Sequence, residues 1–232
     1  MNMPGITLTG VDDYTKVVDM VRLVRLGAEV GFLYTHSPDG RPRYPTKFWI
    51  ETRVFSLAGA AAVHICGQRA RVELLEGKLD MMLERVRRVQ VNGAVNLNEL
   101  SSVCRRYPDK TIITQHIDAN THLVHSRLAN HAILVDASGG RGKLPEKWQR
   151  PDTPKRVGFA GGLGPETLRK ELPKIAAIAG DDYWIDMEGR LRDGDDWFDV
   201  ERALQVMNIW RSFQLLARSS QVESPAITEA SR

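Results

Sequence analysis

One carboxylate stands between an apolar segment and a glycine-rich segment, where it could transfer protons. Asp136 follows the apolar run 132–135 and precedes Gly139 and Gly140. A carboxylate at the end of an apolar strand is costly to bury unless it is paired or used, and carboxyl groups are common general acids and bases. The sequence therefore predicts a catalytic role for Asp136. The alternative is that its side chain only caps the following loop.

Two glycine-rich segments could bind an anion through the backbone. Gly140 and Gly142 follow Asp136, and Gly161 and Gly162 lie in a second such segment that opens an expected helix. Exposed amides in a loop or at a helix start can bind phosphate. We predict a phosphate site at these glycines, although such glycines also serve simply as turns.

A basic segment lies between two apolar runs near the start of the chain. Residues 35–45 (THSPDGRPRYP) contain Arg41 and Arg43. A guanidinium group binds a carboxylate through two parallel hydrogen bonds. The segment therefore predicts a clamp for a substrate carboxylate, with a merely solvated loop as the alternative.

A thiol and an imidazole end another apolar run, residues 61–66. A cysteine such as Cys66 can be a reactive thiolate, and a histidine such as His64 can carry protons near neutral pH. Buried cysteine is equally a small apolar residue. Both remain candidates for catalysis.

Eight short apolar segments could hold these side chains in place. They begin roughly 20–30 residues apart, which suits parallel strands joined by helices. We predict a single (β/α)₈ barrel, in which the carboxyl ends of the strands form the functional mouth. Thr9, Cys66, Asn92, Asp136, Gly161 and Asp186 should meet there. The expected strands are 6–9, 30–34, 61–66, 86–91, 111–115, 132–135, 156–159 and 183–186.

The segments between these strands predict helices. We expect one domain over residues 1–218 and a disordered tail over 219–232, which is rich in small and polar residues. Pro173 should kink or split the helix that contains it. The expected helices are 14–26, 98–106, 121–129, 165–178 and 197–216, while 46–57 suits either a helix or a strand.

Composition excludes several classes of protein. The net charge is +3, with 32 basic residues interspersed among 29 acidic ones, which argues against a nucleic-acid surface. Cys66 and Cys104 form no metal-binding spacing. The first residues do not resemble a signal peptide, and no apolar run approaches the ~20 residues of a membrane span. We expect a soluble, cytoplasmic protein.

Five segments, taken in order, resemble the phosphoribosylanthranilate isomerase family, and the resemblance extends over residues 6–204. The most similar is 159–166 (FAGGLGPE), beside the family pattern Leu-Ala-Gly-Gly-Leu-x-Pro-Glu. The others are 7–11 (TLTGV), 30–38 (VGFLYTHSP), 89–93 (VQVNG) and 134–142 (LVDASGGRG).

The resemblance implies an Amadori rearrangement without cofactor or metal. Asp136 matches the family's general acid, whereas Thr9 stands where the family has its basic cysteine. A threonine hydroxyl is not among the groups that titrate near neutral pH. Either Asp12, His64 or Cys66 replaces the thiol, or the reaction has been lost.

The same resemblance implies the groups that bind substrate. The expected partner is a small anionic phosphorylated substrate, bound by a monomer or a homodimer. Residues 186–190 (DMEGR) replace the family's Ser-Ser-Gly loop at the phosphate, where Arg190 or Arg192 could compensate for the added carboxylates. The implied substrate-binding residues are Arg41, Arg43, Gln90 and Asn92, and the implied phosphate-binding residues are Gly140, Gly142, Gly161, Gly162 and Gly189.

Two other functions stay open. One is another barrel enzyme acting on a phosphorylated or carboxylated sugar, such as an epimerase or an aldolase. The expected strands contain no lysine for a Schiff base, which argues against the aldolase. The other is a ligand-binding descendant without catalysis, which the loss of the cysteine and the acidic loop would favour.

Overall fold

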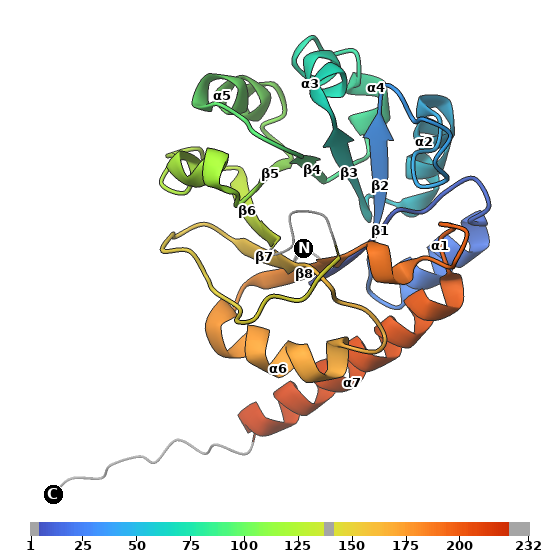
Figure 1. Ribbon diagram of the computed structural model, residues 1–232, viewed down its shortest axis with the longest axis vertical. Coiled ribbons are helices and arrows are strands. Elements are labelled where there is room, and N and C mark those ends of the chain that lie inside the picture. Colours follow the sequence, from blue (N-terminus) through green and yellow to red (C-terminus); the bar gives the residue numbers. More distant parts are fainter. Residues whose placement is uncertain (1–4, 137–141, 223–232) are drawn as a thin grey trace, which may run out of the picture.

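The computed structural model describes residues 5–136 and 142–222 and contains a closed barrel of eight parallel strands (Figure 1). Each strand pairs with the next, and β8 closes the ring against β1. The prediction of a single (β/α)₈ barrel is confirmed, and every predicted strand end lies within two residues of the observed one. The strands are β1 (Ile6–Thr9), β2 (Glu29–Thr35), β3 (Ala61–Cys66), β4 (Arg88–Val91), β5 (Thr111–Gln115), β6 (His131–Asp136), β7 (Val157–Ala160) and β8 (Tyr183–Met187).

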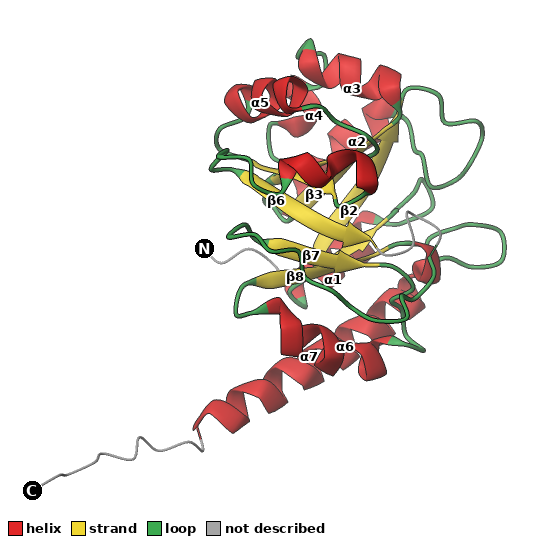
Figure 2. Cartoon of the chain, turned by 60° about the vertical axis from the view of Figure 1, so that its left-hand side comes forward, coloured by secondary structure: helices red, strands yellow, loops and turns green. Residues whose placement is uncertain are grey.

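Helices surround the barrel, and long loops gather at the carboxyl ends of the strands (Figure 2). The helices bury apolar side chains such as Met20, Leu100 and Leu172 against the outer face of the sheet. The described helices are α1 (Val17–Arg25), α2 (Lys47–Val54), η1 (Phe55–Leu57), α3 (Gln68–Leu75), α4 (Asp80–Leu83), α5 (Leu97–Arg106), η2 (Asp118–Leu123), α6 (Leu168–Ala179), η3 (Gly189–Leu191) and α7 (Val200–Val222).

Local signals explain several helix boundaries. The ambiguous segment 46–57 forms α2 and η1, because the Thr46 side chain accepts a hydrogen bond from Trp49 N (3.2 Å) and so caps the helix. Asn96 and Glu99 form a capping box at the start of α5.

One helix prediction was wrong, and the split that was one of two predicted effects of Pro173 is absent. The expected helix 121–129 is the short 3₁₀-helix η2. The Asn120 side chain holds this turn by donating to Gly93 O and Gln115 O, both at 2.9 Å. Pro173 does not split α6. The helix tolerates the missing backbone donor because Leu172 and Ile175 on either side of it are buried in the core.

The last helix extends past the expected end of the barrel. α7 runs to Val222, so the predicted tail 219–232 begins within this helix, and residues 223–232 lie outside the described part of the chain. The final turns of α7 project away from the barrel (Figures 1 and 2).

The amino-terminal end of the barrel is filled by a buried ion pair. Arg88 Nε lies 2.9 Å from Glu29 Oε2, and Thr7 Oγ1 donates to the same oxygen at 2.9 Å. The Arg88 guanidinium lies 4.6 Å from the ring centre of Trp184. A Cβ at Gly158 would lie 2.1 Å from that ring, so glycine is required there. These side chains plug one end of the barrel.

Candidate functional site

A cavity of about 330 Å³ opens at the carboxyl ends of the strands. This volume lies within the range of small-molecule sites. Of the side chains expected to meet at this mouth, those of Asn92, Asp136 and Asp186 line the cavity, together with the backbone of Gly161. Thr9 and Cys66 are hydrogen-bonded to lining residues. Other lining residues are Arg43, His64, Gln90, Gln115, Gly142, Gly162, Glu188, Gly189 and Arg190.

Asp186, at the end of β8, lies at the centre of a polar group drawn from three strands. Its Oδ1 accepts a hydrogen bond from Thr9 Oγ1 at 2.8 Å, and its Oδ2 lies 3.5 Å from His64 Nε2. Burial raises the pKa of Asp186 to about 8, and burial, with a smaller effect of Arg88, lowers the pKa of His64 to about 3. The pair is therefore held in its uncharged form around neutral pH.

Thr9 is fully buried, and its hydroxyl points at Asp186. The adjacent residue of β2 is Gly31, where a Cβ would lie 2.3 Å from Thr9 Oγ1. The glycine thus leaves room for this hydroxyl. Thr9 occupies the expected strand end, and its only described side-chain hydrogen bond serves to hold a carboxylate.

Asp136 ends β6 and pairs in register with Ala160 of β7. Its side chain lines the main cavity and also an adjoining hollow of about 490 Å³ that includes Lys147. Gly140, one of the predicted phosphate-binding residues, lies outside the described residues.

The other predicted phosphate-binding glycines line the same cavity. Gly161 and Gly162 have φ of +110° and +65°, which side-chain-bearing residues rarely adopt. A Cβ at Gly162 would lie 2.4 Å from Leu144 N. Gly142 and Gly189 complete this part of the wall. These backbone segments therefore approach the cavity without side chains in between.

Arg190 lies beside the glycine-rich turn. From the sequence it was considered only as a positive charge that could compensate for the carboxylates in residues 186–190. A Cβ at Gly164 would lie 2.5 Å from Arg190 Cβ, so the two segments are in close contact. The buried Arg190 Nε has no hydrogen-bond partner among the described residues. Arg190 thus brings a cation with an unused, buried donor to the glycine-rich wall of the cavity.

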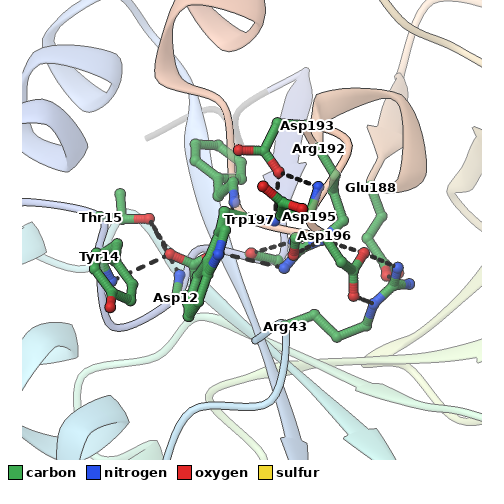
Figure 3. A network of polar contacts seen from close by, with 12 residues as sticks. Asp12, Tyr14, Thr15, Arg43, Glu188, Arg192, Asp193, Asp195, Asp196 and Trp197 are labelled. Carbon is green, nitrogen blue, oxygen red and sulfur yellow. Dashed lines mark hydrogen bonds and ion pairs between the residues drawn. The ribbon is translucent and has the colours of Figure 1, made fainter. Parts of the chain in front are cut away.

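Arg43 is already paired within the protein (Figure 3). Its Nη1 donates to Glu188 Oε1 at 2.6 Å and its Nε donates to Asp196 Oδ2 at 3.0 Å. Arg192 Nε donates to the other oxygen of Asp196 at 2.9 Å. Arg41, the second arginine predicted to bind a carboxylate, is exposed and lies 4.9 Å from the centre of the Tyr44 ring, outside the described lining of the cavity.

Asp12 was considered from the sequence as a replacement for the missing base. In the structure its carboxylate is occupied by hydrogen bonds that hold two loops together. It is fully buried, and its Oδ2 accepts hydrogen bonds from Phe198 N at 2.6 Å and Arg192 Nη2 at 3.4 Å. Its Oδ1 accepts from Thr15 Oγ1 at 3.0 Å (Figure 3). Asp12 thus ties the loop after β1 to the loop before α7.

Gln90, Asn92 and Cys66 form a hydrogen-bonded chain along one wall. Gln90 Nε2 donates to Asn92 Oδ1 at 2.8 Å, and Asn92 Nδ2 donates to Cys66 Sγ at 3.2 Å. Burial, then the charge of Glu188, raises the pKa of Cys66 to about 12. Cys66 is therefore a thiol at neutral pH.

No catalytic or binding role was assigned from the sequence to three polar lining residues, Asp186, Glu188 and Gln115. Asp186 was expected at the mouth, and a role could have been assigned to it because it lies at the end of an apolar strand just as Asp136 does. Gln115 ends β5, and its Oε1 accepts a hydrogen bond from Gly93 N at 2.9 Å. A lone glutamine carries no comparable signal in a sequence.

Among the described residues, no group of three or more histidine, cysteine or acidic side chains is arranged to hold a metal ion. Within the same part of the chain, no helix has the length and apolar character that crossing a membrane would require.

Known proteins resemble this chain in three-dimensional fold. No family model and no curated protein matches its sequence. Phosphoribosylanthranilate isomerase from Thermus thermophilus superimposes with a TM-score of 0.64 and 18% identity, over 92% of this chain and 100% of that one. The Thermotoga maritima enzyme gives 0.64 and 14%, over 91% and 100%.

A further solved structure shows such an isomerase in complex with reduced 1-(o-carboxyphenylamino)-1-deoxyribulose 5-phosphate. It has a TM-score of 0.63 and 14% identity, over 91% of this chain and 100% of that one. The resemblance seen in the sequence is thus confirmed for the three-dimensional structure. The chain has the (β/α)₈ fold of the phosphoribosylanthranilate isomerases.

Proposed function

We propose that this protein is an isomerase that converts a phosphorylated N-aryl ribosylamine to the corresponding aminoketose. The observation that carries the proposal is one cavity lined by two strand-end carboxylates, Asp136 and Asp186, and by glycine-rich turns suited to phosphate. An Amadori rearrangement needs a general acid, a general base and an anchor for the phosphate. The cavity offers candidates for all three.

The phosphate is proposed to bind at the glycine-rich wall. Backbone amides at Gly161 and Gly162, next to Gly142 and Gly189, can donate to phosphate oxygens. Arg190 adds a positive charge with an unused buried donor. Glu188 brings a negative charge to this wall, which its ion pair with Arg43 offsets.

The rest of the substrate is proposed to extend toward Gln90 and Asn92. Both amides line the cavity and can hydrogen-bond hydroxyl or carboxylate groups. Arg43 could hold a substrate carboxylate only by exchanging Glu188 or Asp196 for it, since both occupy its guanidinium. This departure from the expected clamp makes the amides the better-placed groups.

The proton transfers can be assigned as follows. Asp136, as the acid, donates a proton to the ring oxygen; the bond from this oxygen to C1 breaks, and the nitrogen lone pair forms a C1=N bond. A base then takes the proton on C2, the C–H electrons form a C1=C2 bond, and the C1=N pair returns to nitrogen. The enol becomes the ketone as its hydroxyl releases a proton and C1 gains one.

The direct test is turnover of freshly generated phosphoribosylanthranilate, together with complementation of a tryptophan auxotroph that lacks this isomerase. We expect measurable turnover and growth. Phosphate binding without turnover would contradict the proposal and favour the ligand-binding alternative. The strands contain no lysine, so a Schiff-base aldolase remains unsupported.

Arg190→Met is expected to weaken binding of the phosphorylated substrate. A hydrogen bond from a charged group contributes about 1.5–3 kcal/mol, so KM should rise roughly 10- to 100-fold. Steady-state kinetics would measure this, with Lys170→Met on the exposed face of α6 as the control. An unchanged KM would show that the phosphate binds elsewhere.

A further inference from the structure

Asp186 has one carboxylate oxygen that is fixed and one that is unused. Oδ1 accepts the 2.8 Å hydrogen bond from Thr9, while the buried Oδ2 has no hydrogen-bond partner among the described residues. Oδ2 lies 3.5 Å from His64 Nε2, which likewise has no hydrogen-bond partner in the described part of the chain. Both residues line the cavity. Asp186 thus brings to the wall of the proposed substrate cavity a buried oxygen whose carboxylate is held on its other side by Thr9.

The groups around Asp186 set its proton affinity. His64 on β3 and Thr9 on β1 touch it, and Arg88, Glu29 and Glu188 act on it through their charges. Burial dominates and raises its pKa to about 8, against the opposing effects of Thr9 and Arg88. A general base works best when its pKa lies near the working pH.

The other candidate bases are less suitable. Asp12 is enclosed by its hydrogen bonds to the loop before α7. Burial lowers the pKa of His64 to about 3, which makes it a weak base, and the raised pKa of Cys66 keeps that residue a thiol. Asp186 is also the residue to which Thr9, at the position of the family's cysteine, is directly bonded.

We propose that Asp186 is the catalytic base, and that Thr9 is a positioning residue that holds it. The inference rests on the proposed isomerase function. Asp186 Oδ2 takes the proton from C2, whose C–H electrons form the C1=C2 bond, and the resulting carboxylic acid returns a proton to C1 as the ketone forms. The oxygen at the end of β8 thereby does the work assigned to a thiol at the end of β1.

The first test is turnover of phosphoribosylanthranilate by the parent and by Asp186→Asn, as a function of pH. Because Asp186 must be ionised while Asp136 carries its proton, the parent kcat/KM should depend on both groups, and it should show a break near pH 8, from the ionisation of Asp186, that Asp186→Asn lacks. Asp186→Asn should lose about 10²–10⁴-fold. Asp182→Asn, the same change at the exposed residue just before β8, should behave like the parent.

The role of Thr9 has a separate readout. Its hydrogen bond lowers the pKa of Asp186, so Thr9→Val should move the pH midpoint of kcat/KM upward, and Thr9→Ser should restore it. A structural role alone would lower the amount of folded protein without moving this midpoint.

Unfolding provides a readout that needs no substrate. Since the folded pKa of Asp186 is raised above its unfolded value of about 4, the folded state binds the extra proton between these two values. The parent should therefore lose stability relative to Asp186→Asn as pH rises from about 4 to about 8. Urea unfolding at several pH values measures this difference.

The outcomes separate the two proposals. An active parent whose Asp186→Asn variant keeps its rate would overturn the role of Asp186 and leave the isomerase function intact. A parent that is inactive on this substrate would overturn both. An active parent with a flat pH profile and no pH-dependent stability difference would also exclude Asp186 as the titrating base.

Discussion

Replacement of Asp136 by asparagine is expected to lower turnover of phosphoribosylanthranilate by about 10²–10⁴-fold, the usual contribution of a general acid. Asparagine preserves the size of the side chain and its hydrogen-bonding capacity but carries no acidic proton. Because Asp136 lines the cavity at the end of β6, the change should act on the ring-opening step. The KM should change far less than kcat.

The measurement is steady-state turnover, with urea unfolding as the check on folding. Asp181→Asn, at an exposed position in the loop before β8, is the matched control and should retain the parent rate. A variant at position 136 that folds normally and keeps more than about a tenth of the parent rate would remove Asp136 from the chemistry. The acid would then have to be sought among the other lining carboxylates.

The fold was predictable because its signal repeats along the chain. Eight short apolar segments at similar spacing define a (β/α)₈ barrel even when single boundaries are off by a residue or two. The failures were local. Pro173 is tolerated where apolar neighbours pack on both sides, and η2 is set by the hydrogen bonds of Asn120 to distant carbonyls. Neither packing nor long-range hydrogen bonds can be seen from local composition.

The sequence predicted which residues line the candidate site better than it predicted which of their side chains are paired with one another. The strand-end rule located Asp136, Asn92 and, among the described glycines, Gly142, Gly161 and Gly162, all of which line the cavity. The sequence could not show that Arg43 is already held by Glu188 and Asp196, partners about 150 residues further along the chain.

The surroundings of Asp186 were likewise not visible in the sequence. Its sequence position resembles that of Asp136, but its burial, its bond to Thr9 and its contact with His64 come from three strands that meet only in the closed barrel. Proton affinity depends on such surroundings rather than on residue type.

The buried ion pair at the opposite end of the barrel leads to the largest expected change in stability. Arg88→Met leaves the Glu29 carboxylate fully buried beside Thr7 without its cation. Removing one partner of a buried ion pair costs about 3–5 kcal/mol. Burial already raises the pKa of Glu29 despite the opposing charge of Arg88. The loss should therefore be largest at neutral pH and smaller at acid pH, where a protonated Glu29 carries no unpaired charge.

Urea unfolding of Arg88→Met beside the double variant Glu29→Leu/Arg88→Met separates charge from packing. If the cost is that of an uncompensated charge, the double variant should recover most of the lost stability, because apolar residues of similar volume can replace a buried pair. If Arg88 mainly packs on the Trp184 ring, at 4.6 Å from its centre, the double variant should be as unstable as the single one. Lys78→Met, which breaks an exposed pair with Glu76, should change stability little in either case. A small loss in Arg88→Met itself would mean that water or a shifted side chain can reach Glu29, and that the barrel is less tightly closed at this end than its buried surface indicates.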